Sequence, residues 1–268
     1  MLSNPTTILL HILSTDEHYS LYTSLYSFVH SRCSFWFQFQ QFRVQQDRCA
    51  MKISTDAVLL GTLVESDVPK RILDIGTGTG VIALMLAQRF PQANLTALEL
   101  DPEAVSQASE NCEQSPFSER LTVQQGRFQD FPEEERFDLL VSNPPFFPDH
   151  LPTSDPKRQQ ALHTDSLSFE ELLHKASQLL APSGSFWVIL PPRQMQDFIQ
   201  YARFHGLFPR TRVGIRDAAT KPIHREVVGF TFSEPLAIAL PEELLLKNGD
   251  GSYSERYQQL ISGFLLGF

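Results

Sequence analysis

A short stretch of alternating glycines is the first feature of this sequence that could do chemistry. Asp74-Ile-Gly76-Thr-Gly78-Thr-Gly80 follows an apolar run at 71–75 and precedes an Ala- and Leu-rich stretch that is typical of a helix. Glycines let the backbone take positive φ and approach a ligand, and free N–H groups at a helix N-terminus favour a negative group. The spacing D-x-G-x-G-x-G differs from the dinucleotide pattern G-x-G-x-x-G, which disfavours a pyrophosphate grip. We therefore expect this loop to bind a carboxylate or a ribose.

Acidic residues after the next two expected strands could complete the binding site. Glu99 lies near the end of the apolar stretch 94–100, about 20 residues after the glycine loop, where an acid commonly binds ribose hydroxyls. Asp101 is close by, but the proline that follows it makes it a typical helix N-cap. Asp130 and Phe131 come just after the third short strand. If the ribose belongs to a nucleoside, we expect these two residues to contact its adenine base.

A distinctive turn, Asn143-Pro144-Pro145-Phe146, directly follows the apolar run 137–142. The carboxyl ends of strands in a doubly wound sheet face the ligand crevice, so this turn should lie beside the glycine loop. The Asn143 amide oxygen and the Pro144 carbonyl could accept the two N–H bonds of an adenine amine, while Phe146 stacks on the flipped base. Catalysis would then consist of positioning and directed hydrogen bonds, without a metal ion.

The elements that must hold these residues alternate between strands and helices. Seven runs have the hydrophobicity of strands: 71–75, 94–100, 121–124, 137–142, 185–190, 207–215 and 226–232. Stretches with helical spacing lie between most of them. Repeated β-α alternation predicts an α/β fold with a doubly wound, mostly parallel sheet.

The composition is that of a globular chain whose charge is unevenly distributed. The 268 residues are 42% hydrophobic and 20% charged, which suits one large domain with a sizeable core. The net charge of −9 argues against a nucleic-acid partner, but residues 191–225 hold seven basic and two acidic residues. We expect this basic segment to hold an RNA backbone, although a solvated surface would explain it equally well. The residues expected to contact RNA are Arg212, Arg216, Lys221 and Arg225.

The cysteines, the apolar runs and the N-terminal stretch indicate where in the cell the protein acts. The three cysteines form no C-x-x-C pair, which disfavours a zinc site and favours a reducing cytoplasm. No run reaches the ~18 apolar residues that a membrane span needs. Residues 1–34 lack an early Lys or Arg, and Asp16 and Glu17 interrupt their apolar part, unlike a secretory signal. We expect a poorly ordered extension at 1–34, one domain over 35–268, and a monomer that binds no metal.

Taken together, these residues resemble the class I S-adenosylmethionine-dependent methyltransferases, and more narrowly the bacterial tRNA1(Val) adenine-N6 methyltransferases. The stretch 74–80 is similar to the first motif of the class, and 143–146 is similar to its amino-methylating motif. Residues 39–61, which contain FQQFRVQQDRCAMK, STD and LLG, resemble the segment of the narrower family that precedes the first strand and helps to close the cofactor site. The stretch KPIHRE at 221–226 resembles a late segment of that family.

The resemblance implies a Rossmann-like fold in which the mostly parallel sheet has seven strands and an antiparallel edge. It implies S-adenosyl-L-methionine as the cofactor and N6-methylation of adenine 37, next to the anticodon of a valine tRNA. Alternatives are N6-methylation of a ribosomal RNA adenine, N5-methylation of a protein glutamine, and a non-catalytic RNA-binding module. The glutamine enzymes usually carry an N-terminal helical domain, for which 34 residues are too few. An intact glycine loop together with Asn143 disfavours a non-catalytic module.

Overall fold

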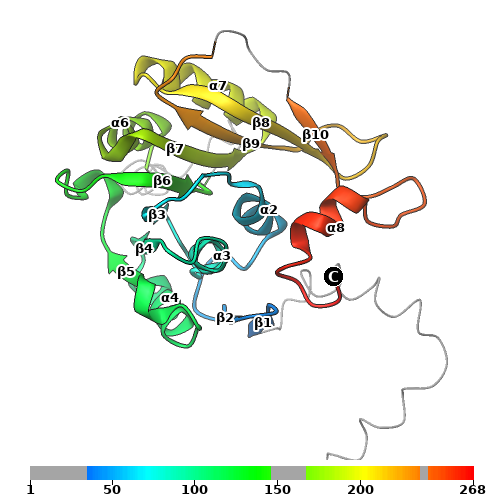
Figure 1. Cartoon of the computed structure of the whole chain (residues 1–268), viewed down its shortest axis with the longest axis horizontal. Helices are drawn as coiled ribbons and strands as arrows, with labels where there is room; N and C mark the ends of the chain where they lie inside the picture. Colours follow the sequence, from blue (N-terminus) through cyan, green and yellow to red (C-terminus); the bar gives the residue numbers. More distant parts are fainter. Residues whose placement is uncertain (1–34, 146–166, 236–240) are drawn as a thin grey trace, which may run out of the picture.

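The computed structural model describes residues 35–145, 167–235 and 241–268, and a mixed sheet of eight strands lies at its centre (Figure 1). The strand order is β10-β8-β9-β7-β6-β3-β4-β5. The five strands from β7 to β5 run parallel, β9 is antiparallel to β7 and to β8, and β10 is parallel to β8. The strands are β3 (Arg71–Ile75), β4 (Asn94–Glu99), β5 (Leu121–Gln125), β6 (Phe137–Ser142), β7 (Leu180–Leu190), β8 (Phe208–Arg216), β9 (Arg225–Thr231) and β10 (Glu242–Leu245).

This sheet confirms the predicted doubly wound, mostly parallel architecture with an antiparallel edge. Seven of its strands correspond to the seven predicted runs, and β10 is an eighth strand that the expected seven-stranded sheet did not include. The four residues of β10 are Glu-Glu-Leu-Leu, of which the two glutamates are exposed and one leucine is fully buried. Such a short run has too little alternation to be recognised as a strand.

Helices cover both faces of the sheet and enclose two hydrophobic clusters. The helices are α2 (Thr55–Leu63), α3 (Val81–Arg89), α4 (Pro102–Glu113), α6 (Phe169–Leu179), α7 (Pro192–Phe204) and α8 (Glu255–Ile261). Side chains of α2, α3 and α8 form one cluster, and those of α6 and α7 form the other. Successive strand residues point to opposite faces, so Ile72 of β3 joins the first cluster and its neighbour Leu73 joins the second.

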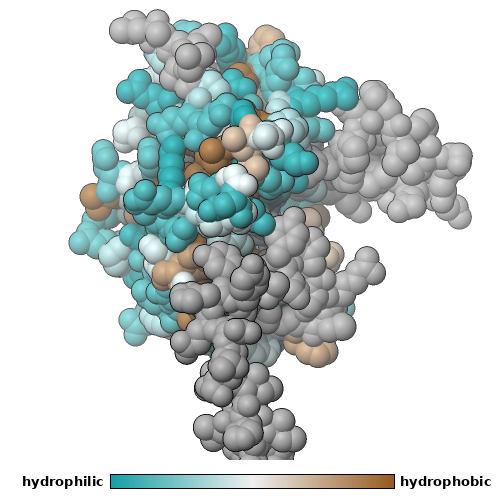
Figure 2. All heavy atoms as spheres, turned by 90° about the vertical axis from the view of Figure 1, so that its right-hand side faces the viewer, coloured by the Kyte–Doolittle hydropathy of each residue, from teal (hydrophilic) through white to brown (hydrophobic). Residues whose placement is uncertain are grey.

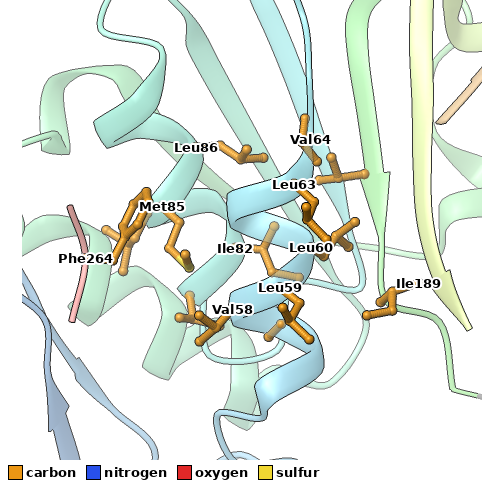
Figure 3. Close-up of a cluster of buried hydrophobic side chains, with 14 of the residues drawn as sticks. Val58, Leu59, Leu60, Leu63, Val64, Ile82, Met85, Leu86, Ile189 and Phe264 are labelled. Atoms are coloured by element: carbon orange, nitrogen blue, oxygen red, sulfur yellow. The ribbon is translucent and has the colours of Figure 1, made fainter. Parts of the chain in front are cut away.

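Two helices of the first cluster, α2 and α3, pack side by side. Figure 3 shows Leu59 and Leu60 of α2 and Ile82 and Met85 of α3 in this cluster, with Phe264 approaching from the C-terminal segment. All four helix side chains are almost completely buried. This packing holds α3 in place, and α3 is the helix that begins at the glycine loop.

A small antiparallel hairpin lies outside the main sheet. Its strands are β1 (Trp36–Gln38) and β2 (Arg43–Gln45), and the turn between them contacts the C-terminal segment. Gln40 donates through Nε2 to the carbonyls of Ser262 and Leu265 at 2.7 and 2.8 Å. The two ends of the described chain therefore meet.

The face seen in Figure 2 is mostly hydrophilic among the described residues, with apolar side chains scattered over it. In the three described ranges, no helix has the length and apolar character that crossing a membrane requires.

Candidate active site

A cavity of about 320 Å³ opens at the carboxyl ends of β3, β4 and β6. These strands are adjacent, because Ile75 of β3 pairs with Leu98 on one side and with Ser142 on the other. Six of the predicted site residues line the cavity: Gly76, Gly78, Glu99, Asn143, Pro144 and Pro145. The glycine loop and the Asn-Pro-Pro turn therefore form walls of a single cavity, as their positions after neighbouring strands predicted.

The first two glycines of the loop leave open space beside them. Gly76 and Gly78 have φ of +73° and +56°, and a Cβ added to either would meet no atom within 4 Å. The amides of Gly76 and Thr77 donate to the Leu98 carbonyl at 2.9 and 3.0 Å, which ties the loop to β4. Because left-handed backbone favours glycine, the loop keeps its shape while leaving room for a ligand.

Gly80 has a different place from the other two glycines. It is the N-cap of α3 with φ of +82°, and a Cβ there would lie 3.5 Å from Ala108 Cβ on α4. It is not part of the cavity wall. Its small size allows the start of α3 to approach α4, so its contribution is to packing.

Asp74 lies beneath the loop and is outside the cavity lining. Its Oδ2 accepts from the Thr77 hydroxyl at 2.5 Å and from the Ala83 amide at 3.2 Å. Its Oδ1 is buried and has no hydrogen-bond partner in the described parts of the chain. The pKa of Asp74 is raised to about 7, mainly because burial disfavours its charged form; nearby Glu99 adds to the rise, and the two hydrogen bonds oppose it. Asp74 therefore shapes the loop from below.

Glu99 lines the cavity and is held by three backbone amides. Its Oε2 accepts from Gly78 N at 2.9 Å, and its Oε1 accepts from Leu100 N and Asp101 N at 2.7 and 3.0 Å. An ionised carboxylate has about four acceptor sites, so capacity remains for ligand hydroxyls. Asp101 caps α4 as predicted, since its side chain accepts from Glu103 N and Ala104 N.

The wall after β5 is formed by residues 126–129, which precede the predicted pair Asp130 and Phe131. Asp130 is exposed at the end of a short 3₁₀ helix, Phe128–Asp130. Phe131 is buried with its ring centroid 5.8 Å from that of Phe137. Neither lines the cavity, whereas Phe128 and Gln129 do. The tight 3₁₀ turn brings these two earlier side chains to the cavity.

The Asn-Pro-Pro turn forms the opposite wall. Ser142 Oγ donates to the Ile75 carbonyl at 3.0 Å, which fixes the end of β6 against the end of β3. Asn143 is half-buried and Pro144 is buried, and none of the hydrogen bonds among described residues uses the Asn143 side chain. Phe146 lies outside the described residues.

A further wall comes from the chain before α2, at Cys49, Ala50 and Met51. Gln107 of α4 positions this segment, since its Oε1 accepts from Arg48 N and Cys49 N at 2.9 and 3.1 Å. Sequence reasoning missed Gln107. Its only signal was a place on the same helical face as Ala104 and Ala108, which predicts burial.

Two exposed apolar side chains contribute to the cavity lining. Met51 is 61% exposed and Leu100 is 44% exposed, and both line the cavity. Apolar walls with a few oriented polar groups are typical of small-molecule sites.

Three of the four residues predicted to bind RNA are held in ion pairs. Arg212 donates to both carboxylate oxygens of Glu226 at 2.8 and 2.9 Å, and Arg225 Nε lies 2.7 Å from Asp56 Oδ2. Arg216 similarly pairs with Glu243, with 2.6 Å between Nη2 and Oε1. Lys221 is exposed in the loop between β8 and β9. That loop lies at the same edge of the sheet as the cavity, because Leu190 at the end of β7 pairs with Glu226 at the start of β9.

Within the described ranges, no cluster of three or more His, Cys, Asp or Glu side chains could hold a metal ion.

Comparison with known proteins shows which family has these features. Residues 50–210 match the model of the methyltransferase small domain. A tRNA1(Val) (adenine(37)-N6)-methyltransferase of Pedobacter heparinus is 42% identical over 233 residues, covering 87% of this chain and 98% of the relative. A protein of the same name from Photorhabdus laumondii is also 42% identical, covering 86% and 95%.

Solved structures share the fold at lower identity. A protein from Agrobacterium tumefaciens described as a predicted O-methyltransferase has a TM-score of 0.63 at 21% identity, covering 78% of this chain and 96% of its own. The glycopeptide N-methyltransferase MtfA, in complex with S-adenosyl-L-methionine, has a TM-score of 0.51 at 12% identity, covering 69% and 97%.

Proposed function

Because this chain belongs to the tRNA1(Val) (adenine(37)-N6)-methyltransferase family, we propose that it transfers a methyl group from S-adenosyl-L-methionine to N6 of adenine 37 in a valine tRNA. The observation that carries the proposal is the single cavity shared by the glycine loop and the Asn-Pro-Pro turn. One wall suits the cofactor and the other suits the amine that receives the methyl group.

The glycine-loop side of the cavity fits S-adenosyl-L-methionine. Gly76 and Gly78 leave the space that a ligand backbone would occupy, and Glu99 can accept hydrogen bonds from ribose hydroxyls. Leu100 and Phe128 supply apolar surface for an adenine ring, in place of the expected Asp130 and Phe131. When bound, the cofactor supplies an electrophilic methyl group on a sulfonium centre.

The Asn-Pro-Pro side fits the target adenine. The Asn143 side-chain oxygen and the Pro144 carbonyl accept the two N6–H bonds, which orients the amine and favours a more pyramidal nitrogen. Proline stiffens the backbone that carries the second acceptor. We keep Phe146 as the stacking residue for the extruded base.

The β8–β9 loop contacts the tRNA in this proposal, with Lys221 as its exposed cation. Arg212, Arg216 and Arg225 are paired with carboxylates of neighbouring elements. Their positive charges are therefore partly neutralised, which weakens their attraction for a phosphate. We also propose that the enzyme acts in the cytoplasm as a monomer. A tRNA substrate supports that location.

Replacement of Asn143 tests the proposal most directly. Asn143→Ala should lower kcat for methylation of unmodified valine tRNA by about 10²–10³-fold, because one oriented acceptor is lost. Affinity for S-adenosyl-L-methionine, measured by calorimetry, should change little. The matched control is Asn94→Ala, an exposed asparagine at the amino end of β4, which should retain the wild-type rate.

The substrate is tested by the position of the methyl group. Total RNA from cells that lack the gene is incubated with labelled cofactor, and the labelled nucleotide is mapped. Label at adenine 37 of valine tRNA supports the proposal. Label in ribosomal RNA or in protein, or wild-type single-turnover rates for Asn143→Ala, would contradict it.

A further inference from the structure

A second cavity, of about 300 Å³, lies between α7 and the first half of β8. It shares no lining residue with the candidate active site. Its polar wall consists of two glutamines and three arginines: Gln196, Gln200, Arg203, Arg210 and Arg212. Every polar side chain in this wall can donate hydrogen bonds, and none of them is acidic.

Two of the arginines have no counter-charge paired with them in the described parts of the chain. Arg203 and Arg210 are exposed, and neither guanidinium forms a hydrogen bond or ion pair with the described parts of the chain. Arg212 differs, because its bidentate pair with buried Glu226 fixes it as a rigid part of the wall. Like charges around one cavity repel each other, so an anion that binds between them would be stabilised.

The donors extend along the cavity and do not converge on one point. Gln196, Gln200 and Arg203 lie on one face of α7, at spacings of four and three residues. At 1.5 Å of rise per residue, the first and last of them are about 10 Å apart along the helix axis. Arg210 lies across from them on β8. Such a row of donors suits a chain of anions better than a single small ion.

We propose that this cavity binds successive phosphate groups of the tRNA backbone. Guanidinium groups match phosphate oxygens in geometry, and amide side chains add neutral donors beside them. The inference rests on the proposed function, since it takes tRNA as the substrate. It also gives the basic segment a role that the ion-paired arginines Arg216 and Arg225 do not offer.

The test uses the full chain with Arg203→Gln, Arg210→Gln and both together. Glutamine keeps much of the side-chain length and removes the charge. Affinity for an unmodified valine tRNA transcript is measured by filter binding between about 50 and 200 mM KCl. Each lost phosphate contact should make the log–log salt dependence shallower by about 0.7, so the double variant should lose about 1.4. Its affinity at low salt should fall about tenfold, with kcat at saturating tRNA unchanged.

The matched control is Arg136→Gln, which removes one exposed arginine from the acidic stretch before β6. Its salt dependence should equal that of the wild type. A wild-type slope in the double variant, with normal methylation, overturns this inference and leaves the proposed function intact. If the wild type does not methylate the transcript, the proposed function fails, and the slopes still decide whether the cavity binds RNA. Loss of inorganic phosphate binding with unchanged RNA binding would instead assign the cavity to a free anion and overturn the proposal.

Discussion

Asp74 is a carboxylic acid that the fold buries almost completely beneath the glycine loop, at 1% exposure. Burial disfavours the charged form and raises its pKa to about 7, well above the ordinary value of 3.8. Between these two pH values the folded protein keeps a proton that the unfolded chain has lost. The stability that Asp74 contributes is therefore present at low pH and is lost as pH rises toward 7.

Replacing Asp74 by asparagine should expose this dependence. The Asp74→Asn side chain stays neutral, so the free energy of unfolding of the variant, relative to wild type, should rise between about pH 4 and pH 7. The largest slope expected for one group is about 1.4 kcal/mol per pH unit. Urea unfolding at pH 5 and pH 8 measures the difference, and any constant cost of the substitution cancels. The same difference at both pH values would show that Asp74 titrates normally.

The sequence predicted which strand end each site residue lies at more reliably than it predicted whether the side chain faces the cavity. Glu99 is the last residue of β4 and Asn143 follows the last residue of β6, and both line the cavity. Asp74 and Gly80 also lie at the loop, but one points beneath it and the other packs on α4. Spacing along the chain specifies which edge of a sheet a residue reaches, whereas its direction depends on local turns. The 3₁₀ turn before Phe131 is such a case.

At the scale of structural elements, the glycine loop depends on a left-handed backbone conformation that only glycine adopts readily. Gly78 and Gly206 both have positive φ, +56° and +70°, and in both a Cβ would meet no atom within 4 Å. Gly78 lines the candidate active site, and Gly206 follows the end of α7. The two positions therefore share the same strain and differ in what lies beside them.

Alanine at these two positions should separate backbone strain from cofactor binding. Gly78→Ala and Gly206→Ala should each lower the free energy of unfolding by about 1–2 kcal/mol, because left-handed backbone is costly for alanine. Only Gly78→Ala places a methyl group in the cofactor cavity, so it alone should weaken S-adenosyl-L-methionine binding, by about tenfold. Calorimetric titration measures this. Equal cofactor affinities in the two variants would move the cofactor away from the glycine loop.

Elements with strong periodicity were predicted well, and those that depend on tertiary partners were not. The strands β3, β4 and β6 are rich in apolar residues, because parallel strands are buried on both faces. The hairpin β1–β2 and strand β10 have three or four residues each and were missed. The basic segment was recognised by composition, but its pairing with Asp56, Glu226 and Glu243 depends on how β8 and β9 lie against each other, against β10 and against α2.

At the scale of the whole molecule, contacts between residues near the two ends of the described chain close the structure. Phe39 forms an antiparallel bridge with Leu265, and Gln40 N donates to the Phe264 carbonyl at 2.8 Å. Phe39 is fully buried, and Phe264 and Leu265 belong to the same cluster as α2 and α3. No sequence pattern predicts this contact, because it joins segments more than two hundred residues apart.

The side chain of Gln40 provides a test of how much this closure stabilises the fold. Its Nε2 lies within hydrogen-bonding distance of the carbonyls of Ser262, Leu265 and Phe268. Gln40→Ala should lower the free energy of unfolding by about 1–2 kcal/mol, as partly exposed hydrogen bonds are lost. In urea, Cm should fall while the m-value stays the same, because the surface exposed on unfolding hardly changes.

The neighbouring residue Gln41 provides a matched control for Gln40→Ala. Gln41 is exposed, and no hydrogen bond of its side chain is present among the described residues, so Gln41→Ala should leave Cm unchanged. Hydrogen exchange adds a local readout: amides in 261–268 should exchange faster in Gln40→Ala, since the segment loses its anchor to the hairpin. Neither residue lines the active-site cavity, so kcat should be that of the wild type in both variants. Equal Cm values for the two variants would mean that the buried rings of Phe39 and Phe264 and the backbone contacts, and not the Gln40 side-chain hydrogen bonds, hold the two segments together.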